Sequence, residues 1–329
     1  MTDPDDPRVG DLAESAILRV ILDSIGTAEG AEVGPGDDAA VLRAPDGRVV
    51  ATTDTLVHGP DFRLAWSSGA DLGWKAAAVN LADVAAMGAH PTGLLVALAM
   101  PADTRLSFVR DFAEGLAACC NALAPGCAVI GGDLTISSTL TIAVTALGSL
   151  QGRAPVLRSG ARPGDVVALA GAAGLAARGI DLLFSRFTDA SGPIAVERSA
   201  LDSVELEALD AQLRPSPPIA LGVIAADAGA TAMMDVSDGL ALDATRLAES
   251  SGVTLALRTT SVGGDARWAI DGGEDHALLA TFPPGSPLPD GFRPIGEVVA
   301  AGESPLVVDG VPRSPRGWDP YRDWDSGRG

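Results

Sequence analysis

The 329-residue sequence has few of the residues on which several common classes of protein depend. Its three cysteines, Cys119, Cys120 and Cys127, are too few and too close together for a disulfide framework, which favours a reducing compartment. No apolar run approaches the roughly 20 residues that cross a bilayer, because Arg and Asp interrupt every candidate. The N-terminus, MTDPDDPRVGD, lacks the basic and then apolar order of a signal peptide, so we expect a cytoplasmic protein.

Basic residues are also scarce. The chain has 23 Lys and Arg against 43 Asp and Glu, for a net charge of −20. This charge argues against nucleic acid and anionic membranes as partners, because both are bound through Lys and Arg. Lys75, in DLGWKAAAV, is the only lysine, so the sequence contains no phosphate-binding loop of the GxxxxGK[ST] type. Nucleotide binding would therefore depend on divalent cations collected by carboxylates.

The order of apolar patterns predicts two α+β domains. In the first half we expect helices over 11–26, 70–88 and 104–124, and strands over 39–45, 48–56, 92–101, 127–134 and 139–150. In the second half we expect strands over 166–171, 231–236, 253–257 and 276–282, and helices over 171–184, 219–228 and 239–251. Residues 185–205 have only a weak pattern. Strands and helices mix without strict βαβ alternation, which indicates the α+β class. The Gly-, Pro- and Arg-rich segment 151–165 marks the boundary, giving domains 1–152 and 153–329.

Several acidic residues lie at the ends of apolar strands or inside apolar helices, often beside glycine. They are Asp37 and Asp38 in GPGDDAAVL, Asp54 in VVATTDTL, Asp83 in AVNLADVAAMG, Asp133 in AVIGGDL, Asp235 and Asp238 in AMMDVSDGL, and Glu274 and Asp275 in DGGEDHALL. Each alone could be a turn or a helix cap. Together they predict one shared acidic site, because a buried carboxylate needs a cationic partner and cationic side chains are few.

The neighbours of these acids indicate the kind of cation and ligand. Hydroxyl groups at Thr52, Thr53 and Ser237 add hard oxygen donors, which suit Mg²⁺ or Ca²⁺, and three histidines are too few to favour a zinc site. Adjacent glycines allow backbone N–H groups to approach phosphate oxygens. Arg158, in VLRSGARPGD, is a candidate for a fixed charge on a phosphate, or else a surface arginine of a linker. Carboxylates, metal ions and phosphates together predict phosphoryl transfer by positioning and charge neutralisation.

Seven separated motifs, from about residue 10 to residue 321, resemble in order and spacing those of the thiamine-monophosphate kinase family, within the superfamily of aminoimidazole ribonucleotide synthetase. These motifs are GPGDDAAVL, TTDTLVHGPDF, KAAAVNLADVAAMGAHPTGLLVAL, VIGGDL, VLRSGARPGD, MMDVSDGL and GGEDHALLATF. The resemblance implies a two-domain α+β subunit whose N-terminal strands join those of a second copy in a barrel, giving a homodimer. It also implies transfer of phosphate from ATP to thiamine monophosphate, directly and without a phosphoenzyme, giving thiamine diphosphate and ADP.

The resemblance further implies roles for individual residues. The implied magnesium ligands are Asp37, Thr52, Thr53, Asp54, Asp83, Asp133, Asp235 and Asp238, of which Asp54, Asp133 and Asp235 would be central to catalysis. The implied nucleotide contacts are Gly132, Asp133, Arg158 and Ser237. The implied acceptor contacts are Asp61, Glu274 and Trp318. Trp318, in GWDPY, could stack on a cationic thiazolium ring, or alternatively fill an apolar gap near the C-terminus.

The sequence departs from the family pattern mainly where the acceptor would bind. Asp61 stands where the family usually has histidine, and His276 and Ala277 stand where its GEDYEL motif has Tyr and Glu. The stretch between Arg258 and Asp271 is short where the family often has a further helix. Two alternatives therefore remain open. One is an ATP-using enzyme with another acceptor, similar to aminoimidazole ribonucleotide synthetase, and the other is a non-catalytic paralogue that binds Mg-ATP.

Overall fold

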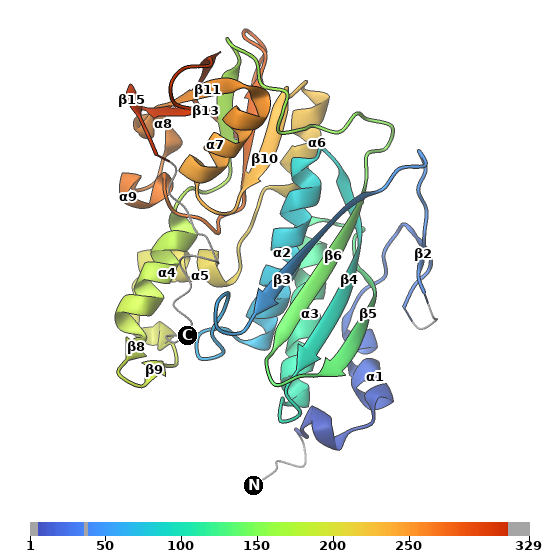
Figure 1. Ribbon diagram of the computed structural model, residues 1–329. Coiled ribbons are helices and arrows are strands. Elements are labelled where there is room, and N and C mark those ends of the chain that lie inside the picture. The colour runs from blue at the N-terminus through green and yellow to red at the C-terminus, as the bar shows by residue number, and fades with distance from the viewer. Residues whose placement is uncertain (1–5, 36–38, 315–329) are drawn as a thin grey trace.

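The computed structural model describes residues 6–35 and 39–314, which form two large sheets with helices packed against them (Figure 1). Helices and strands mix along the chain without strict alternation, so the predicted mixed α and β content is confirmed. Cys119, Cys120 and Cys127 are free and buried. Among the described residues, no helix combines the length and the apolar character that crossing a membrane requires.

The first sheet has four strands in the order β3, β6, β4, β5. Their bounds are β3 Val50–Val57, β6 Thr141–Ser149, β4 His90–Met100 and β5 Val129–Ile136. Neighbouring strands are antiparallel except for β4 and β5, which are parallel. Helices α2 (Gly69–Ala86) and α3 (Leu106–Leu123) cover one face (Figure 1), and the apolar side chains between them and the sheet form the core of the first half. Strands β3 and β5 are therefore the two edges of this sheet.

The elements before the first sheet lie beside α3 and β5. They are the 3-10 turn η1 (Val9–Asp11), helix α1 (Glu14–Ser24) and strands β1 (Ala31–Val33) and β2 (Val41–Leu42). Helix α1 packs against α3, close to the helix that the apolar spacing predicts. The strand expected over 39–45 is wrong in length, because only two of its residues pair, with an irregular register against β1.

The second large sheet has seven strands in the order β10, β12, β7, β13, β11, β14, β15. Their bounds are β7 Val166–Ala170, β10 Ala232–Val236, β11 Val253–Leu257, β12 Ala277–Phe282, β13 Phe292–Ala300, β14 Leu306–Val308 and β15 Val311–Pro312. The helices of this half are α4 Leu175–Arg186, α5 Ser203–Leu213, α6 Ile219–Asp227, α7 Leu240–Ser251, α8 Thr259–Val262 and α9 Ala266–Ala269. Across residues 6–35 and 39–314, neither large sheet closes into a barrel.

Helix α5 differs from the sequence-based expectation, which gave the region around it no helix. Short pieces precede it, namely β8 Thr188–Asp189, β9 Gly192–Pro193 and the 3-10 turn η2 Arg198–Ala200. The helix begins with a reciprocal cap between Asp202 and Glu205, a pattern that marks a helix start even where the apolar spacing is weak. Its Leu209 and Leu213 pack with α4 residues in a small separate core. Tertiary packing therefore stabilises a helix that has little amphipathic pattern of its own.

Helix α2 connects the two halves of the molecule. It contacts the first sheet on one side and α6 and β10 of the second half on the other (Figure 1). The crossing with α6 is close, because a side chain at Gly222 would place its Cβ 2.1 Å from the carbonyl oxygen of Ala85. Residues on this side of α2 therefore lie at the junction of the two halves, where the acidic residues of both meet.

Candidate active site at the junction of the two halves

Four carboxylates from both halves of the chain meet at this junction, and we call them the acidic cluster: Asp54, Asp83, Asp235 and Asp238. Asp54 lies on β3, Asp83 near the end of α2, Asp235 on β10, and Asp238 in the turn between β10 and α7. The charges of Asp235 and Asp54 act on Asp83, and those of Asp235 and Asp238 act on Asp54. Segments up to 184 residues apart in the sequence thus contribute to one anionic site.

The acidic cluster has too little positive charge around it. Burial, together with the neighbouring charges of Asp235 and Asp54, raises the pKa of Asp83 to about 7. Burial also raises the pKa of Asp54, and the charges of Asp235 and Asp238 add to that effect. A raised pKa means that the ionised carboxylate is poorly stabilised by its surroundings. A bound cation would therefore stabilise the ionised acidic cluster.

The imidazole of His276 reaches the acidic cluster from the loop before β12. Its Nδ1 lies 3.1 Å from Oδ2 of Asp235, and both side chains are buried. Burial lowers the pKa of His276, but the hydrogen bond and the charge of Asp235 outweigh it, so the pKa lies above its usual value. At the residue that departs from the family motif, the Asp235 carboxylate therefore favours the protonated form of the imidazole.

Thr52 and Thr53 point to opposite faces of the first sheet, because side chains alternate along a strand. The hydroxyl of Thr52 donates to Oδ2 of Asp83 over 2.7 Å, so Thr52 belongs with the acidic cluster. The hydroxyl of Thr53 donates to the carbonyl oxygen of Val144 over 2.9 Å and accepts from Thr145 over 3.2 Å. Of the two threonines expected from the sequence, only Thr52 directs its side chain to the cluster.

The turn between β10 and α7 is held by a residue pair that the sequence analysis missed. Arg246 Nη1 lies 2.6 Å from Oδ2 of Asp238 and 2.7 Å from Oδ1 of Asp243. The backbone N–H of Asp238 donates to Asp243 Oδ2 over 3.0 Å. Asp243 is fully buried, and burial with the charge of Asp235 raises its pKa to about 6. The i, i+3 spacing of Asp243 and Arg246 on a helix was the available signal.

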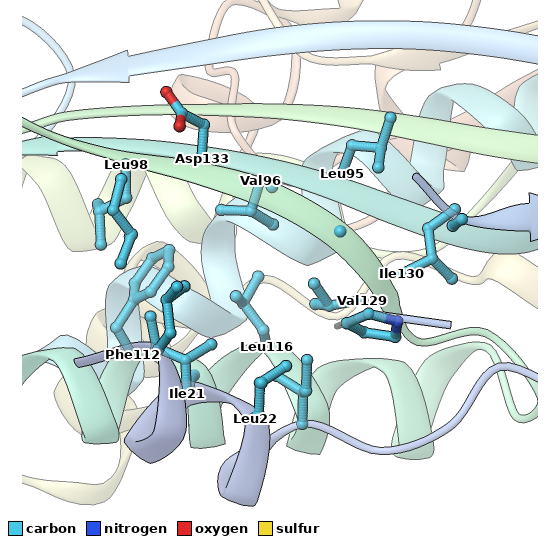
Figure 2. A pocket seen from close by; sticks show the side chains of 18 of the residues that line it. Ile21, Leu22, Leu95, Val96, Leu98, Phe112, Leu116, Val129, Ile130 and Asp133 are labelled. Atoms are coloured by element: carbon cyan, nitrogen blue, oxygen red, sulfur yellow. The ribbon is translucent and has the colours of Figure 1, made fainter. Parts of the chain in front are cut away.

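Gly132 and Asp133 lie on β5, at the opposite edge of the first sheet from Asp54. Gly132 is required by close strand contact, because a Cβ there would lie 2.0 Å from the carbonyl oxygen of Val96. An apolar cavity of about 800 Å³ lies between this edge, α1 and α3, and Figure 2 shows the Asp133 carboxylate pointing away from Phe112 and Leu116 on α3.

The position of Asp133 separates it from the acidic cluster of its own chain. Asp133 pairs in register with Ala97, which pairs with Ala143, which pairs with Thr55, so the four share a row across the outward face. Three strand spacings of about 4.8 Å place β5 about 14 Å from β3. Asp54 also points to the other face. The structure therefore does not bring Asp133 to the four carboxylates.

Ser237 and Arg158 lie at opposite ends of the β10 and α7 unit. Ser237 lies between Asp235 and Asp238, and its carbonyl oxygen accepts from the N–H of Glu274 over 2.7 Å. Arg158 is exposed, and its carbonyl oxygen accepts from Ser251 in the last turn of α7 over 2.7 Å. Because α7 has 12 residues, it is about 18 Å long. Arg158 could therefore contact only the far end of a ligand that binds at Ser237.

The expected acceptor residues Glu274 and Asp61 lie near each other, since the charge of Glu274 contributes to the raised pKa of Asp61. Glu274 forms an ion pair with Lys75 of α2, and its Oε2 also accepts from Gln212 Nε2 over 3.2 Å. Asp61 Oδ2 accepts from the N–H of Val57 over 2.7 Å, which closes the turn after β3. Lys75 and Gln212 were not expected, and their partner is too far away in sequence to leave a local signal.

The donors of the acidic cluster fit magnesium bound together with a phosphate ligand. In the described part of the chain, no three carboxylate, imidazole or thiol groups lie close enough together to hold a metal ion by themselves. Mg²⁺ usually keeps several waters and takes one or two carboxylates, while the phosphates of a substrate supply further oxygens. The acidic cluster supplies hard oxygen donors and lacks compensating positive charge, so it meets this requirement. Two of the expected site residues, Asp37 and Trp318, lie outside the described residues.

Comparison with known proteins gives three findings. The family model described as "AIR synthase related protein, N-terminal domain" matches residues 36–150. A thiamine-monophosphate kinase from Mycobacterium tuberculosis is 37% identical, over 97% of this chain and 93% of that protein. Two solved structures are also similar. The thiamine-monophosphate kinase of Stenotrophomonas maltophilia K279a has a TM-score of 0.74 and 30% identity, covering 92% of this chain and 98% of the other. The structure named AaThiL complexed with AMPPCP and TMP has a TM-score of 0.73 and 31% identity, covering 94% and 98%.

Proposed function

The chain belongs to the thiamine-monophosphate kinase family, and we propose that it transfers the terminal phosphate of ATP to thiamine monophosphate with the help of Mg²⁺. The products are thiamine diphosphate and ADP. The observation that carries this proposal is the acidic cluster, in which carboxylates of both halves meet beside Glu274. An anionic site can receive an anionic nucleotide only if cations are bound with it.

Within the proposed site, Asp54, Asp83, Asp235 and Asp238 would hold the magnesium ions. Bound magnesium would neutralise charge on the phosphates and on the oxygen that leaves. The chain itself aligns the reactants. An oxygen of the acceptor phosphate attacks the γ-phosphorus, the bond from that phosphorus to the bridging oxygen breaks, and ADP leaves with the electron pair. Little covalent work falls to the protein, so catalysis depends on position and charge.

The nucleotide would extend from Ser237 towards Arg158. Ser237 has a hydroxyl group and lies just before the N-terminus of α7, where backbone N–H groups favour anions. Arg158, at the other end of α7, would contact the part of the nucleotide farthest from the reacting phosphate. The acceptor would lie on the side of Glu274 and Asp61, with Trp318 as a further contact to its cationic ring. We keep the division into domains 1–152 and 153–329, and the cytoplasmic location, as predictions.

We also propose that two copies associate through the outward face of the first sheet. Small residues, among them Ala97 and Ala143, form a row on this face, and Leu95 is exposed there. Both edge strands, β3 and β5, have one side without a partner strand in the described residues. Joining two such sheets edge to edge would give the barrel that the family resemblance implies, and would place β5 of one copy beside β3 of the other.

In this arrangement Asp133 would serve the site of the partner rather than its own. This proposal accounts for its distance from Asp54 within one chain. It can be tested by co-expressing Asp54→Asn and Asp133→Asn chains with different tags and isolating the mixed dimer. Activity of the mixed dimer well above that of either pure variant would support the proposal. A mixed dimer as inactive as both parents would contradict it, as would a monomeric chain in sedimentation.

The activity itself is tested by incubating the protein with Mg-ATP and thiamine monophosphate and separating the thiamine phosphates by chromatography. We expect thiamine diphosphate and an equal amount of ADP, and neither product when EDTA is present. If ATP raises the melting temperature only with magnesium and no thiamine diphosphate forms, the alternative acceptor or the non-catalytic paralogue is favoured. A lack of any magnesium-dependent effect of ATP would contradict the proposal as a whole.

A further inference from the structure

The only lysine of the chain is buried at the junction of the two halves. Lys75 lies on α2 with 4% of its surface exposed, and Leu72, Ala76 and Val79 around it on the helix are buried apolar residues. A charged ammonium in such surroundings is costly unless it is fully paired. Its partners come from the second half of the chain. Nζ donates to the side chain of Glu274 and to the carbonyl oxygen of Gln212, the latter over 3.3 Å.

Glu274 is held on one side and open on the other. Its Oε2 accepts from Lys75 and, over 3.2 Å, from Nε2 of Gln212. The side chain nevertheless keeps 35% of its surface exposed, whereas that of Lys75 keeps 5%. Its backbone has φ of 72°, a conformation that non-glycine residues rarely adopt, and its N–H donates to Ser237 within the loop of the acidic cluster. A contact that only joined the two halves would not need an open face on the carboxylate.

We propose that Lys75 is a positioning residue, which with Gln212 holds the ionised Glu274 so that its open face receives the positively charged ring of the acceptor. The inference rests on the proposed function, because that function supplies a cationic acceptor. Lys75 itself is behind Glu274 and does not touch the acceptor. It makes Glu274 a fixed anion, whereas without it the carboxylate would be free to turn or to take up a proton. Burial raises the pKa of Glu274, but the charge and hydrogen bond of Lys75 outweigh it, so the pKa lies below its usual value.

The test is calorimetric titration of thiamine monophosphate into the protein with magnesium and a non-hydrolysable ATP analogue. Lys75→Met should weaken binding about tenfold, the loss expected for one charge-assisted contact. In steady-state assays it should raise KM for the acceptor by about the same factor, with KM for ATP within about twofold of wild type. The matched control is Arg214→Met, because Arg214 also joins α5 to α2, but its ion pair is with Asp71 rather than Glu274 and its side chain is 48% exposed. This control should bind the acceptor as wild type does.

A double-mutant cycle separates positioning from simple structural support. If Lys75 acts through Glu274, the variant Lys75→Met with Glu274→Gln should bind the acceptor no more weakly than Glu274→Gln alone, within about twofold. Losses that multiply, or a Lys75→Met protein that matches wild type or the Arg214→Met control, would overturn the proposal. If Lys75→Met fails to fold, comparing the double variant with Glu274→Gln still tests the proposal, because the double variant has no unpaired buried charge.

Failure of the inference and failure of the proposed function give different results. A wild-type protein that binds thiamine monophosphate but transfers no phosphate contradicts the proposed function. The calorimetric titrations would still show whether Lys75 contributes to acceptor binding. A wild-type protein that does not bind thiamine monophosphate contradicts both.

Discussion

Thr52 donates its hydroxyl hydrogen to Asp83 over 2.7 Å, and this bond joins β3 to α2 inside the acidic cluster. Thr53, its neighbour, bonds instead to Val144 and Thr145 on the outward face. The two hydroxyls can therefore be removed separately, each with a methyl group in its place. This pair gives a direct measure of which face of the sheet holds the cations.

Thr52→Val should weaken magnesium binding by roughly threefold, because Asp83 loses the donor that orients it. Thr53→Val should leave the magnesium affinity of the chain near that of wild type. Titration of magnesium in the presence of ATP, followed by the melting temperature, measures both. Equal losses in the two variants would mean that the cations also bind through the outward face.

Asp54→Asn should abolish turnover, with a loss in kcat of at least about a hundredfold, because the variant removes a charge on which the transferring phosphate depends. The fold should persist, since the amide has the shape of the carboxylate and relieves repulsion from Asp235. Circular dichroism and the melting temperature check the fold. Asp23→Asn, at an exposed position of α1, is the control for removing one negative charge. Near wild-type turnover by Asp54→Asn would argue strongly against the proposed metal site.

Asp83 should make the metal-free protein less stable as the pH rises. Burial and the charge of Asp235 raise its folded-state pKa to about 7 from a reference value of 3.8. The folded state thus keeps a proton that the unfolded state has already released. The stability that Asp83 contributes is therefore complete below its unfolded-state pKa of 3.8, and it is lost as the pH rises through its folded-state pKa of about 7.

Asp83→Asn does not titrate, so it should gain stability relative to wild type between about pH 4 and about pH 8, by on the order of 2 kcal/mol. Urea unfolding in EDTA at several pH values measures this difference. Adding magnesium at the higher pH should shrink it, because the cation replaces the proton. A difference that does not change with pH would contradict the raised pKa.

Asp61→His restores the residue usual in the family but removes the bond that closes the turn at Val57. We expect a loss in stability of about 1 kcal/mol, the usual cost of one such hydrogen bond. Asp61→Asn keeps an oxygen acceptor and should lose less. Acceptor affinity of the histidine variant should equal or exceed that of wild type if the pocket is of the family type. Loss of activity beyond the change in stability would show that Asp61 contacts the substrate itself.

Arg246→Met should destabilise the protein by about 2 kcal/mol, because it leaves the fully buried Asp243 without its guanidinium partner. The loss should be smaller below about pH 5, where Asp243, whose pKa is raised to about 6 by burial and Asp235, is protonated. The control is Arg198→Met. Its pair with Asp210 has both side chains about half exposed, so removing it should cost less than about 0.5 kcal/mol. Denaturant unfolding of both variants measures the difference.

Apolar periodicity located most of the elements. The helix over 70–88 and the strands around it were predictable because each has a long pattern of one period. Helix α5 was not, since its helical state depends on contact with α4 and on the Asp202 cap. The strand over 39–45 was overestimated, because local residue preference does not reveal how many residues find a partner.

The site was predictable as a set of acids but not as a geometry. Asp54, Asp83, Asp235 and Asp238 were expected together, and the structure brings them together. Asp133 carried an equally clear motif, yet its place is decided by strand order, which no local pattern encodes. The partner of Lys75 is 199 residues away, so the sequence could identify an unusual lysine but not its contact.

Helix α2 carries Lys75 near the acceptor and Asp83 in the acidic cluster, and eight residues of regular helix separate them by about 12 Å. Peptide geometry alone sets this interval, so it does not change when the surrounding loops move. Because Lys75 holds Glu274 from this helix, only a compound whose cationic centre and phosphate are spaced to reach both Glu274 and the acidic cluster would bind fully, so the enzyme would discriminate among phosphate esters by length. Inserting one residue into α2 between Lys75 and Asp83 would rotate these two side chains by about 100° relative to each other, whichever residue were added.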